Sequence, residues 1–335
     1  MIRIGMNGFG RIGRLILRSL IEANREKEIQ IVGINDLTSA QTHAHLLKYD
    51  SVHGIFPKDI SHFEDTIDVG YGPIKIYKHS NPLDIPWKDL NIDLVMECTG
   101  IFANREGAQK HIDAGAPKVL ISAPADNVDL TVVYGVNHHE IKNDHKIISN
   151  ASCTTNCLAP VAFVLNNSVG IEKGYMTTIH SYTGDQNLVD TAHKDLRRAR
   201  AGALSMIPTS TGAAKAVGLV LPELKGKLDG TAIRVPTPNV SVVDFKFVSK
   251  KQTTVEEINN AIIDASQKGS LKDILVTNDL PLVSCDFNHN PASSIFDLTQ
   301  TQVVDGNLVR VLSWYDNEWG FSNRMIDTAL SFAKK

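Results

Sequence analysis

The chain has 335 residues, of which 42% are hydrophobic and 21% charged, and its formal net charge is −3. This composition excludes a disordered, collagen-like or coiled-coil protein, and the slight acidic excess argues against a general polyanion binder. The length predicts two domains. Four cysteines are too few for a disulfide framework, and the sequence contains no apolar leader or membrane-length apolar run. We therefore expect reduced thiols, a cytoplasmic protein and no membrane partner.

In chain order, the first half alternates short apolar runs with helical patterns. The runs at 2–7, 29–35, 94–98 and 119–122 predict strands, and the apolar spacing at 12–23 and 105–114 predicts helices. The second half has longer β-rich runs, at 176–180, 232–235, 240–248 and 309–315, with helical patterns at 213–220 and 255–267. The fold class that we predict is α/β: a Rossmann-type doubly wound parallel sheet, followed by an α+β domain with a mostly antiparallel sheet.

The change of texture places the domain boundary close to residue 152. We expect a nucleotide-binding domain over 1–152, with a C-terminal helix at 318–335 packing back on it. A second, catalytic domain is expected over 153–317. The stretch 184–212 has little periodicity, and a segment of that length without regular structure predicts an ordered functional loop.

A dinucleotide motif stands at the end of the first predicted strand. Residues 8–13 read GFGRIG, a G-x-G-x-x-G between a strand and a helix. In this pattern Gly8 permits the tight turn, Gly10 lets the backbone approach a pyrophosphate, and Gly13 allows close packing of helix and strand. The helix N-terminus adds amide donors and a partial positive charge. The motif predicts binding of a dinucleotide.

Asp36 directly follows the second predicted strand, 23 residues after Gly13. A carboxylate there accepts hydrogen bonds from the ribose hydroxyls and repels a 2′-phosphate, which favours NAD over NADP. Thr99 and Ser122 follow the next two strands, where ligands of open α/β sheets bind. Each is either a neighbour of the cofactor or a strand-end turn residue.

Cys153 lies in the segment SNASCTTNC at 149–157, where polar capping residues precede an apolar helical run. A thiol at a helix N-terminus has a lowered pKa, and the adjacent amides can stabilise an oxyanion. Cys157 lies one turn later and suggests a disulfide or metal clip, but the sequence lacks a second closely spaced cysteine pair. We expect no metal, and expect Cys157, Cys98 and Cys285 to be buried small hydrophobes.

A cysteine nucleophile needs a base, and His180 is the best placed of the 12 histidines because it ends a strand-like run. Candidate anion contacts follow it. The basic run 193–200 is either a solvated face or a phosphate site. Ser210, Thr211 and Gly212 open a helical pattern and offer anion donors. Arg234 lies in an apolar strand, where a phosphate or carboxylate would pair with it.

Nearly the whole chain resembles the NAD-dependent, phosphorylating glyceraldehyde-3-phosphate dehydrogenases. The resemblance is carried by NGFGRIGR at 7–14, LLKYDSVHG at 46–54, SNASCTTNCLAP at 149–160 and HSYTGDQ at 180–186. It continues in DLRRARAGA at 195–203, PTSTGAAKAVG at 208–218, RVPTPNVSVVD at 234–244 and SWYDNEWGFSNR at 313–324.

The resemblance implies a glycolytic homotetramer in which Cys153 is the nucleophile and His180 its base. By the same resemblance, Arg11, Ile12, Asp36, Thr99 and Ser122 line the NAD site, and Asn317 holds the nicotinamide amide. Thr183 and Arg234 bind the substrate phosphate. Five further residues bind the attacking inorganic phosphate or help to position the substrate: Ser152, Thr154, Arg198, Thr211 and Gly212. Residues 184 to about 205 form a loop that reaches a neighbour's cofactor site.

Three departures from the family pattern bear on specificity. Thr191-Ala192 stands where many NAD-specific members have Leu-Pro, and Ser80 stands in place of an arginine near the adenine. Residues 284–300 are similar to erythrose-4-phosphate dehydrogenases, which hydrolyse their thioester. That activity stays open as an alternative, as does a non-catalytic NAD- or RNA-binding protein on this fold. Nucleic acid is not expected as the main partner.

Overall fold

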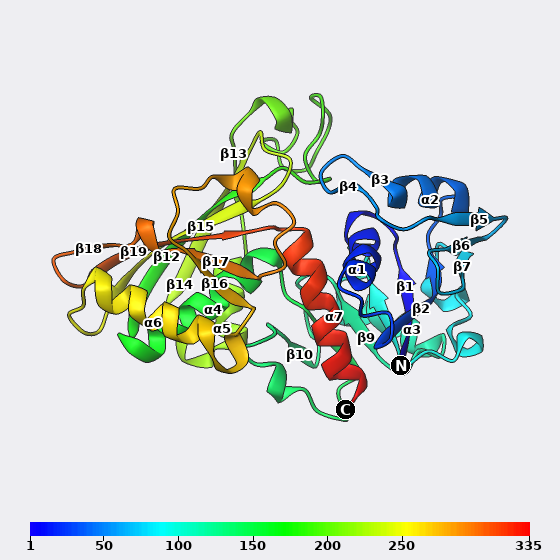
Figure 1. Cartoon of the computed structure of the whole chain (residues 1–335), viewed down its shortest axis with the longest axis horizontal. Coiled ribbons are helices and arrows are strands. Elements are labelled where there is room, and N and C mark those ends of the chain that lie inside the picture. Colours follow the sequence, from blue (N-terminus) through cyan, green and yellow to red (C-terminus); the bar gives the residue numbers. More distant parts are fainter. The chain divides into compact units, whose positions relative to one another are not determined.

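The structure is a computed structural model that describes residues 1–335, and it contains two compact units (Figure 1). The first unit comprises Met1–Tyr134, His138–Ala151 and Ser322–Lys335. The second comprises Gly135–Asn137 and Ser152–Phe321. None of the helices combines the length and the apolarity that crossing a membrane requires.

The first unit is built on a nine-stranded sheet in the order β10-β11-β9-β8-β1-β2-β7-β6-β5. Its neighbours pair in parallel from β10 to β7, and β7, β6 and β5 add an antiparallel edge. The strands are β1 (Ile2–Asn7), β2 (Ile29–Asn35), β5 (Ser61–Phe63), β6 (Thr66–Asp68), β7 (Pro73–Tyr77), β8 (Leu94–Glu97), β9 (Val119–Ile121), β10 (Leu130–Thr131) and β11 (Ile147–Ser149).

Three helices belong to this unit, α1 (Arg11–Glu22), α2 (Ala40–Lys48) and α3 (Arg105–Asp113), together with the hairpin of β3 (Tyr49–Asp50) and β4 (Gly54–Ile55). Ile4 and Met6 of β1 and the apolar residues of β8 are buried because both strands are central, covered on both faces. The last helix, α7 (Trp319–Ala333), belongs to this unit from Ser322 onward, and its Asp327 pairs with Arg25 at 2.6 Å.

The second unit is built on an eight-stranded sheet in the order β13-β14-β12-β15-β19-β17-β16, with β18 also paired to β19. Five of its strand pairs are antiparallel, and two, β12 with β14 and β16 with β17, are parallel. The strands are β12 (Ile171–Ser181), β13 (Ile207–Ser210), β14 (Leu228–Val235), β15 (Ser241–Ser249), β16 (Leu275–Asn278), β17 (Ser294–Asp297), β18 (Gln302–Val304) and β19 (Leu308–Tyr315).

Helices α4 (Cys153–Ser168), α5 (Ala213–Val220) and α6 (Val255–Gln267) pack against this sheet. The predicted fold class is confirmed, a parallel-rich α/β sheet and a mostly antiparallel one. Within the stretch expected as a loop, residues 207–210 form the edge strand β13. Sequence periodicity missed it because the strand is only four residues long and contains Pro208, which an edge strand tolerates.

Candidate functional site

The turn between β1 and α1 has the geometry that its three glycines require. Gly8 has φ +91°, and a Cβ there would lie 2.7 Å from the amide nitrogen of Thr99. A Cβ on Gly13 would lie 2.4 Å from the carbonyl oxygen of Gly8, so helix and loop are in direct backbone contact. Any larger residue at either position would force the two segments apart.

Gly10 differs from the other two glycines, because a Cβ there would meet nothing within 4 Å. It occupies the N-cap of α1, which has no side-chain cap and no acidic residue in its first turn. The side chain of Arg11 pairs with Asp50 at 2.8 Å. The helix N-terminus is therefore open in front of Gly10, and this space fits the pyrophosphate of a dinucleotide.

Asp36 lies immediately beyond β2 and faces the same turn. Its carboxylate accepts hydrogen bonds from the amides of Phe9, at 2.8 Å, and Thr38, at 3.1 Å. Burial alone would raise the pKa of Asp36, but His43 and these two amides outweigh it and hold the pKa well below its ordinary value. The group is a fixed carboxylate with acceptor positions left for ribose hydroxyls.

Thr99 and Ser122 lie beyond the carboxyl ends of β8 and β9. The amide and the hydroxyl of Thr99 both donate to Glu97, the amide at 2.7 Å. The amide of Ser122 donates to the Glu97 carbonyl at 2.9 Å. Both residues are therefore held at the edge of the sheet where Gly8 turns, and the shared anchor is Glu97.

Glu97 belongs to a buried network that sequence reasoning missed. Its carboxylate accepts from Asn7 at 2.6 Å and lies 2.9 Å from Nε2 of His111. Trp87 donates its indole N–H to Nδ1 of His111 at 3.0 Å. Because Nδ1 must accept, Nε2 carries the ring proton and donates to Glu97. An acidic residue at the end of an apolar strand, in LVME at 94–97, was the available signal.

The second unit brings Cys153 and His180 together. Cys153 is the first residue of α4, whose N-cap Ser152 accepts from the amide of Thr155 at 3.0 Å. His180 lies near the end of β12 and is 4% exposed. Its Nε2 is 3.6 Å from the Cys153 sulfur. The two residues are 27 positions apart in the sequence and form a thiol–imidazole pair.

Arg234 is the cross-strand neighbour of His180, because β12 and β14 run in parallel register at that pair. Its Nη1 lies 2.8 Å from His180 Nδ1 and donates to the carbonyl of Ser181 at 3.2 Å. Nδ1 is also 2.8 Å from that carbonyl, so it faces a guanidinium that can only donate and a carbonyl that can only accept, and the two contacts favour opposite tautomers of the ring. Arg234 Nε is buried without a hydrogen-bond partner, and Arg234 forms no ion pair with a carboxylate.

Burial and the neighbouring Arg234 cation lower the pKa of His180 to about 3, so its ring is uncharged and both effects oppose its protonation. For Cys153, burial raises the pKa of the thiol and is the larger effect, while Arg234 and hydrogen bonds with Thr154 act in the opposite direction. The prediction that the helix N-terminus gives Cys153 a lowered pKa is therefore wrong for the folded chain, because the effect of burial is larger.

Tyr315 and Asn317 complete the surroundings of the pair. The Tyr315 hydroxyl joins Thr154, at 2.8 Å, to Thr178, at 2.9 Å, and its ring meets that of His180 edge-on with centroids 5.9 Å apart. Sequence reasoning did not single out Tyr315. The side-chain oxygen of Asn317 accepts from Ser181 and Ser241, both at 2.9 Å. This orientation leaves the amide NH2 group for another acceptor.

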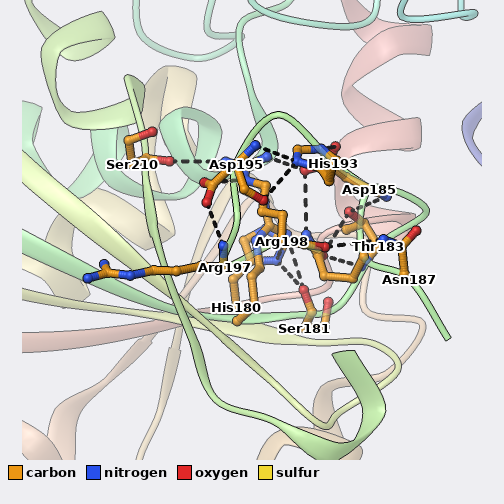
Figure 2. A network of polar contacts seen from close by, with 12 residues as sticks. His180, Ser181, Thr183, Asp185, Asn187, His193, Asp195, Arg197, Arg198 and Ser210 are labelled. Carbon is orange, nitrogen blue, oxygen red and sulfur yellow. Dashed lines mark hydrogen bonds and ion pairs between the residues drawn. The ribbon is translucent and has the colours of Figure 1, made fainter. Parts of the chain in front are cut away.

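Two of the other predicted anion residues, Thr183 and Arg198, lie in a polar network on the loop after β12 (Figure 2). Arg198 forms ion pairs with Asp185 and, at 3.4 Å, with Asp195. Thr183 donates its amide to Gln186 at 2.9 Å. Arg198 thus has two carboxylate partners, in contrast to Arg234. Thr211 and Gly212 directly precede α5. The Thr211 hydroxyl accepts a hydrogen bond from the Ala213 amide at 3.2 Å, and Gly212 is the N-cap residue of the helix and provides no side-chain cap.

The other cysteines differ from one another. Cys157 is buried beside Ser294 and Ser313, and burial raises the pKa of its thiol to about 12. Cys98 is half-buried. The expectation that Cys285 is buried is wrong: it is exposed, because it lies in the short turn Ser284–Phe287, whose buried residue is Phe287.

Comparisons with known proteins identify the class and then the family. A family model described as "Glyceraldehyde 3-phosphate dehydrogenase, NAD binding domain" matches residues 2–105. Another, described as "Glyceraldehyde 3-phosphate dehydrogenase, C-terminal domain", matches residues 152–317. The open turn at Gly10 and the Asp36 carboxylate fit the cofactor that the first description names. The protein is an NAD-dependent dehydrogenase, as predicted.

Full-length relatives agree with these matches. The chain is 65% identical over 333 residues to a glyceraldehyde-3-phosphate dehydrogenase of Xanthobacter flavus, covering 99% of both chains. It is 60% identical over 333 residues to one of Cereibacter sphaeroides, again covering 99% of both. The Pseudomonas aeruginosa enzyme is 56% identical over 332 residues, covering 99% of this chain and 98% of that enzyme. The chain belongs to the glyceraldehyde-3-phosphate dehydrogenase family, and the predicted function as a glycolytic oxidoreductase is confirmed.

Proposed function

We propose that this enzyme converts D-glyceraldehyde 3-phosphate to 1,3-bisphosphoglycerate, with NAD and inorganic phosphate as co-substrates. The observation that carries the proposal is the Cys153 sulfur 3.6 Å from His180 Nε2, with the Arg234 guanidinium beside the ring. A nucleophile that retains the acyl group and a separate cation for a phosphate are the two features that this chemistry needs.

Cys153 attacks first. In the tautomer whose Nδ1 proton is donated to the Ser181 carbonyl, Nε2 of His180 accepts the thiol proton while the sulfur bonds to the aldehyde carbon. An anion that draws the Arg234 guanidinium away from Nδ1 would favour this tautomer. The aldehyde oxygen then takes up that proton, which gives a thiohemiacetal. Amides at the start of α4 are placed to stabilise the oxygen while it is negative.

Oxidation leaves a thioester on Cys153. When bound, NAD supplies the acceptor for the hydride of the substrate carbon. Nε2 of His180 removes the proton of the thiohemiacetal hydroxyl. An oxygen of inorganic phosphate then attacks the thioester carbon, the carbon–sulfur bond breaks, and the Cys153 thiol is restored with the proton held by His180.

Arg234, with Thr183, is proposed to bind the phosphate of the substrate. Its partnerless buried Nε supports this role, because a buried guanidinium without a carboxylate is expensive unless an anion pairs with it. A phosphate on Arg234 also offsets the cation that opposes protonation of His180. The base would therefore become stronger when substrate is present.

The other anion residues are proposed for the attacking phosphate: Ser152, Thr154, Arg198, Thr211 and Gly212. For NAD, the proposed contacts are the turn at Gly8, Gly10, Arg11, Ile12 and Gly13, the carboxylate of Asp36, and Thr99, Ser122 and Asn317. The unit containing residues 1–134 would be the NAD-binding domain, and the unit containing residues 152–321 the catalytic domain.

We propose a homotetramer in the cytoplasm. Supporting the first point, the loop after β12 exposes large apolar side chains: Leu188 is 83% exposed, Leu196 82% and Leu204 84%. Surfaces of this kind are usually covered by another chain. Four free thiols support a reducing compartment. Sedimentation velocity would give one tetrameric boundary, whereas a monomer at micromolar concentration would contradict the assembly.

The decisive assay follows NADH formation with glyceraldehyde 3-phosphate and with erythrose 4-phosphate, each with and without inorganic phosphate. The proposal expects rapid turnover of glyceraldehyde 3-phosphate that requires phosphate. Turnover of erythrose 4-phosphate without phosphate dependence would instead indicate a hydrolytic enzyme, and absence of turnover with either aldehyde would indicate a binding protein.

A further inference from the structure

A buried histidine lies behind the carboxylate of Asp36. His43, on the first turns of α2, is 2% exposed, and its Nε2 is 3.3 Å from Asp36 Oδ1. The ring meets the side of Phe9 edge-on, with centroids 5.3 Å apart. Neither ring nitrogen has a well-aligned hydrogen bond. The polar contact of the ring is therefore the one between its Nε2 and the carboxylate of Asp36.

His43 is the one neighbour of Asp36 that can change its charge. The other two donors are the backbone amides of Phe9 and Thr38, which are neutral at every pH. Histidine changes charge in the physiological range, and a cation 3.3 Å from the carboxylate would cancel most of its field. His43 is therefore the ionisable side chain in contact with Asp36.

Other titratable groups on the elements that pack against α2 face elsewhere. Asp50 of β3 pairs with Arg11, and Asp68 of β6 accepts from the amides of two glycines. A separate pocket is lined by His45 and Lys48 of α2, by His62 of β5, and by Asp59. Asp36 is thus the ionised group that His43 contacts.

We propose that His43 makes the exclusion of NADP depend on pH. Protonated His43 neutralises Asp36 and lets the site tolerate a phosphate on the adenosine ribose, whereas neutral His43 leaves the full negative charge that repels it. The proposal rests on the role proposed above for Asp36 as the ribose-binding carboxylate. It assigns His43 as a specificity-determining residue that acts through Asp36.

Calorimetric titration tests the proposal without turnover, through the dissociation constants of NAD and NADP at about pH 6 and about pH 8. For the wild type, the ratio of the NADP to the NAD constant is expected to rise with pH. The 2′-phosphate itself takes up a proton near pH 6, so some rise occurs in any variant. In His43→Leu and His43→Gln the rise should be smaller by about tenfold.

Proton uptake gives a second reading. Because binding and protonation are reciprocal, NADP binding near neutral pH should draw more protons into the wild type than into either His43 variant, as measured in buffers of different ionisation enthalpy. An unchanged melting temperature of His43→Gln would show that the variant is folded. His45→Leu, on the opposite side of the same helix, should behave as the wild type.

Two failures are distinguishable. Equal pH dependence and equal proton uptake in the wild type and both His43 variants would overturn the role of His43. Asp36→Asn tests the underlying assignment: it should bind NADP more tightly than the wild type at about pH 8. If it does not, the proposed role of Asp36 fails, and the inference about His43 fails with it.

Discussion

The first unit builds most of its candidate site from one contiguous strand–turn–helix segment, completed by residues beyond the ends of β2, β8 and β9, whereas the second assembles its site from four elements. Gly8, Gly10 and Gly13 act through backbone geometry, and Asp36 is held by the amide of Phe9 in that turn and by the amide of Thr38. Cys153, His180, Arg234 and Tyr315 come from α4, β12, β14 and β19. Binding a dinucleotide requires a surface, which one segment can supply. Moving protons between a thiol and an imidazole requires side chains at set distances, which only packed elements supply.

Loss of the nucleophile should break the second site while sparing the first. Cys153→Ser is expected to reduce oxidation by at least about 10⁴-fold, because a serine hydroxyl beside this base is a far weaker nucleophile than the thiol. NAD affinity, measured by calorimetry, should stay within about twofold of the wild type. Cys157→Ser is the matched control for folding. Substantial activity in Cys153→Ser would remove the proposed role of the sulfur.

Loss of the base should have the next largest effect. His180→Asn is expected to lower kcat by about 10²–10⁴-fold and to slow alkylation of Cys153 by iodoacetamide, because the variant has no side-chain base to accept the thiol proton. Peptide mapping separates Cys153 from the exposed Cys285, whose rate serves as an internal reference. The same alkylation rate at Cys153 with and without the imidazole would contradict the assignment.

The two arginines sharpen the comparison within the second unit. Arg234→Leu should raise KM for glyceraldehyde 3-phosphate by about 10²-fold, because its guanidinium has no carboxylate partner and is free for an anion. Arg198→Leu should raise it less, since Asp185 and Asp195 already neutralise Arg198. Unphosphorylated glyceraldehyde is the control, as its KM should move little in either variant. An equal rise in KM in both variants would show that the carboxylate partners of Arg198 do not make it less important than Arg234 for binding the substrate.

Gly8 and Gly10 differ in their surroundings: Gly8 is packed against the chain itself, whereas Gly10 faces open space that we propose holds the cofactor. Gly8→Ala should destabilise the fold by about 1–3 kcal/mol, because its positive φ and its contact with Thr99 both resist a Cβ. Gly10→Ala should leave the melting temperature nearly unchanged and weaken NAD binding, since its Cβ would enter open space. Thermal denaturation and calorimetry measure the two effects. A stable Gly8→Ala protein would contradict the packing argument.

The smallest expected effect is electrostatic and concerns Arg11, whose side chain pairs with Asp50. Burial raises the pKa of Asp50, but the amides of His53 and Val52 and the Arg11 cation lower it to about 2. This stabilisation is present above the unfolded value near 4 and is lost as the pH falls to about 2. Asp50→Asn should therefore lower the free energy of unfolding by about 1 kcal/mol at neutral pH, after allowance for the partly exposed Arg11. Urea titration at two pH values measures it; an equal difference between Asp50→Asn and the wild type near pH 2 would contradict it.

Several elements were predictable because their signals are local. The strand at Ile29–Asn35 and the helices at Ala213–Val220 and Val255–Gln267 have the predicted bounds, since each repeats an apolar spacing over several residues. The family was recognisable from the segment around Cys153. The strand β13 and the network of Glu97 and His111 were not predicted, because their stability comes from neighbours distant in sequence.

The sequence by itself determined the two fold classes, the dinucleotide turn and the family, because glycines at fixed offsets and periodic apolar residues act over a few positions. The sequence singled out His180 among the 12 histidines, but only the tertiary structure decided that its Nε2 lies 3.6 Å from the Cys153 sulfur. It also decided that Arg234 has no carboxylate partner while Arg198 has two, and that His43 lies against Asp36. Strand register and helix packing set these distances, and neither depends on residues adjacent in the chain.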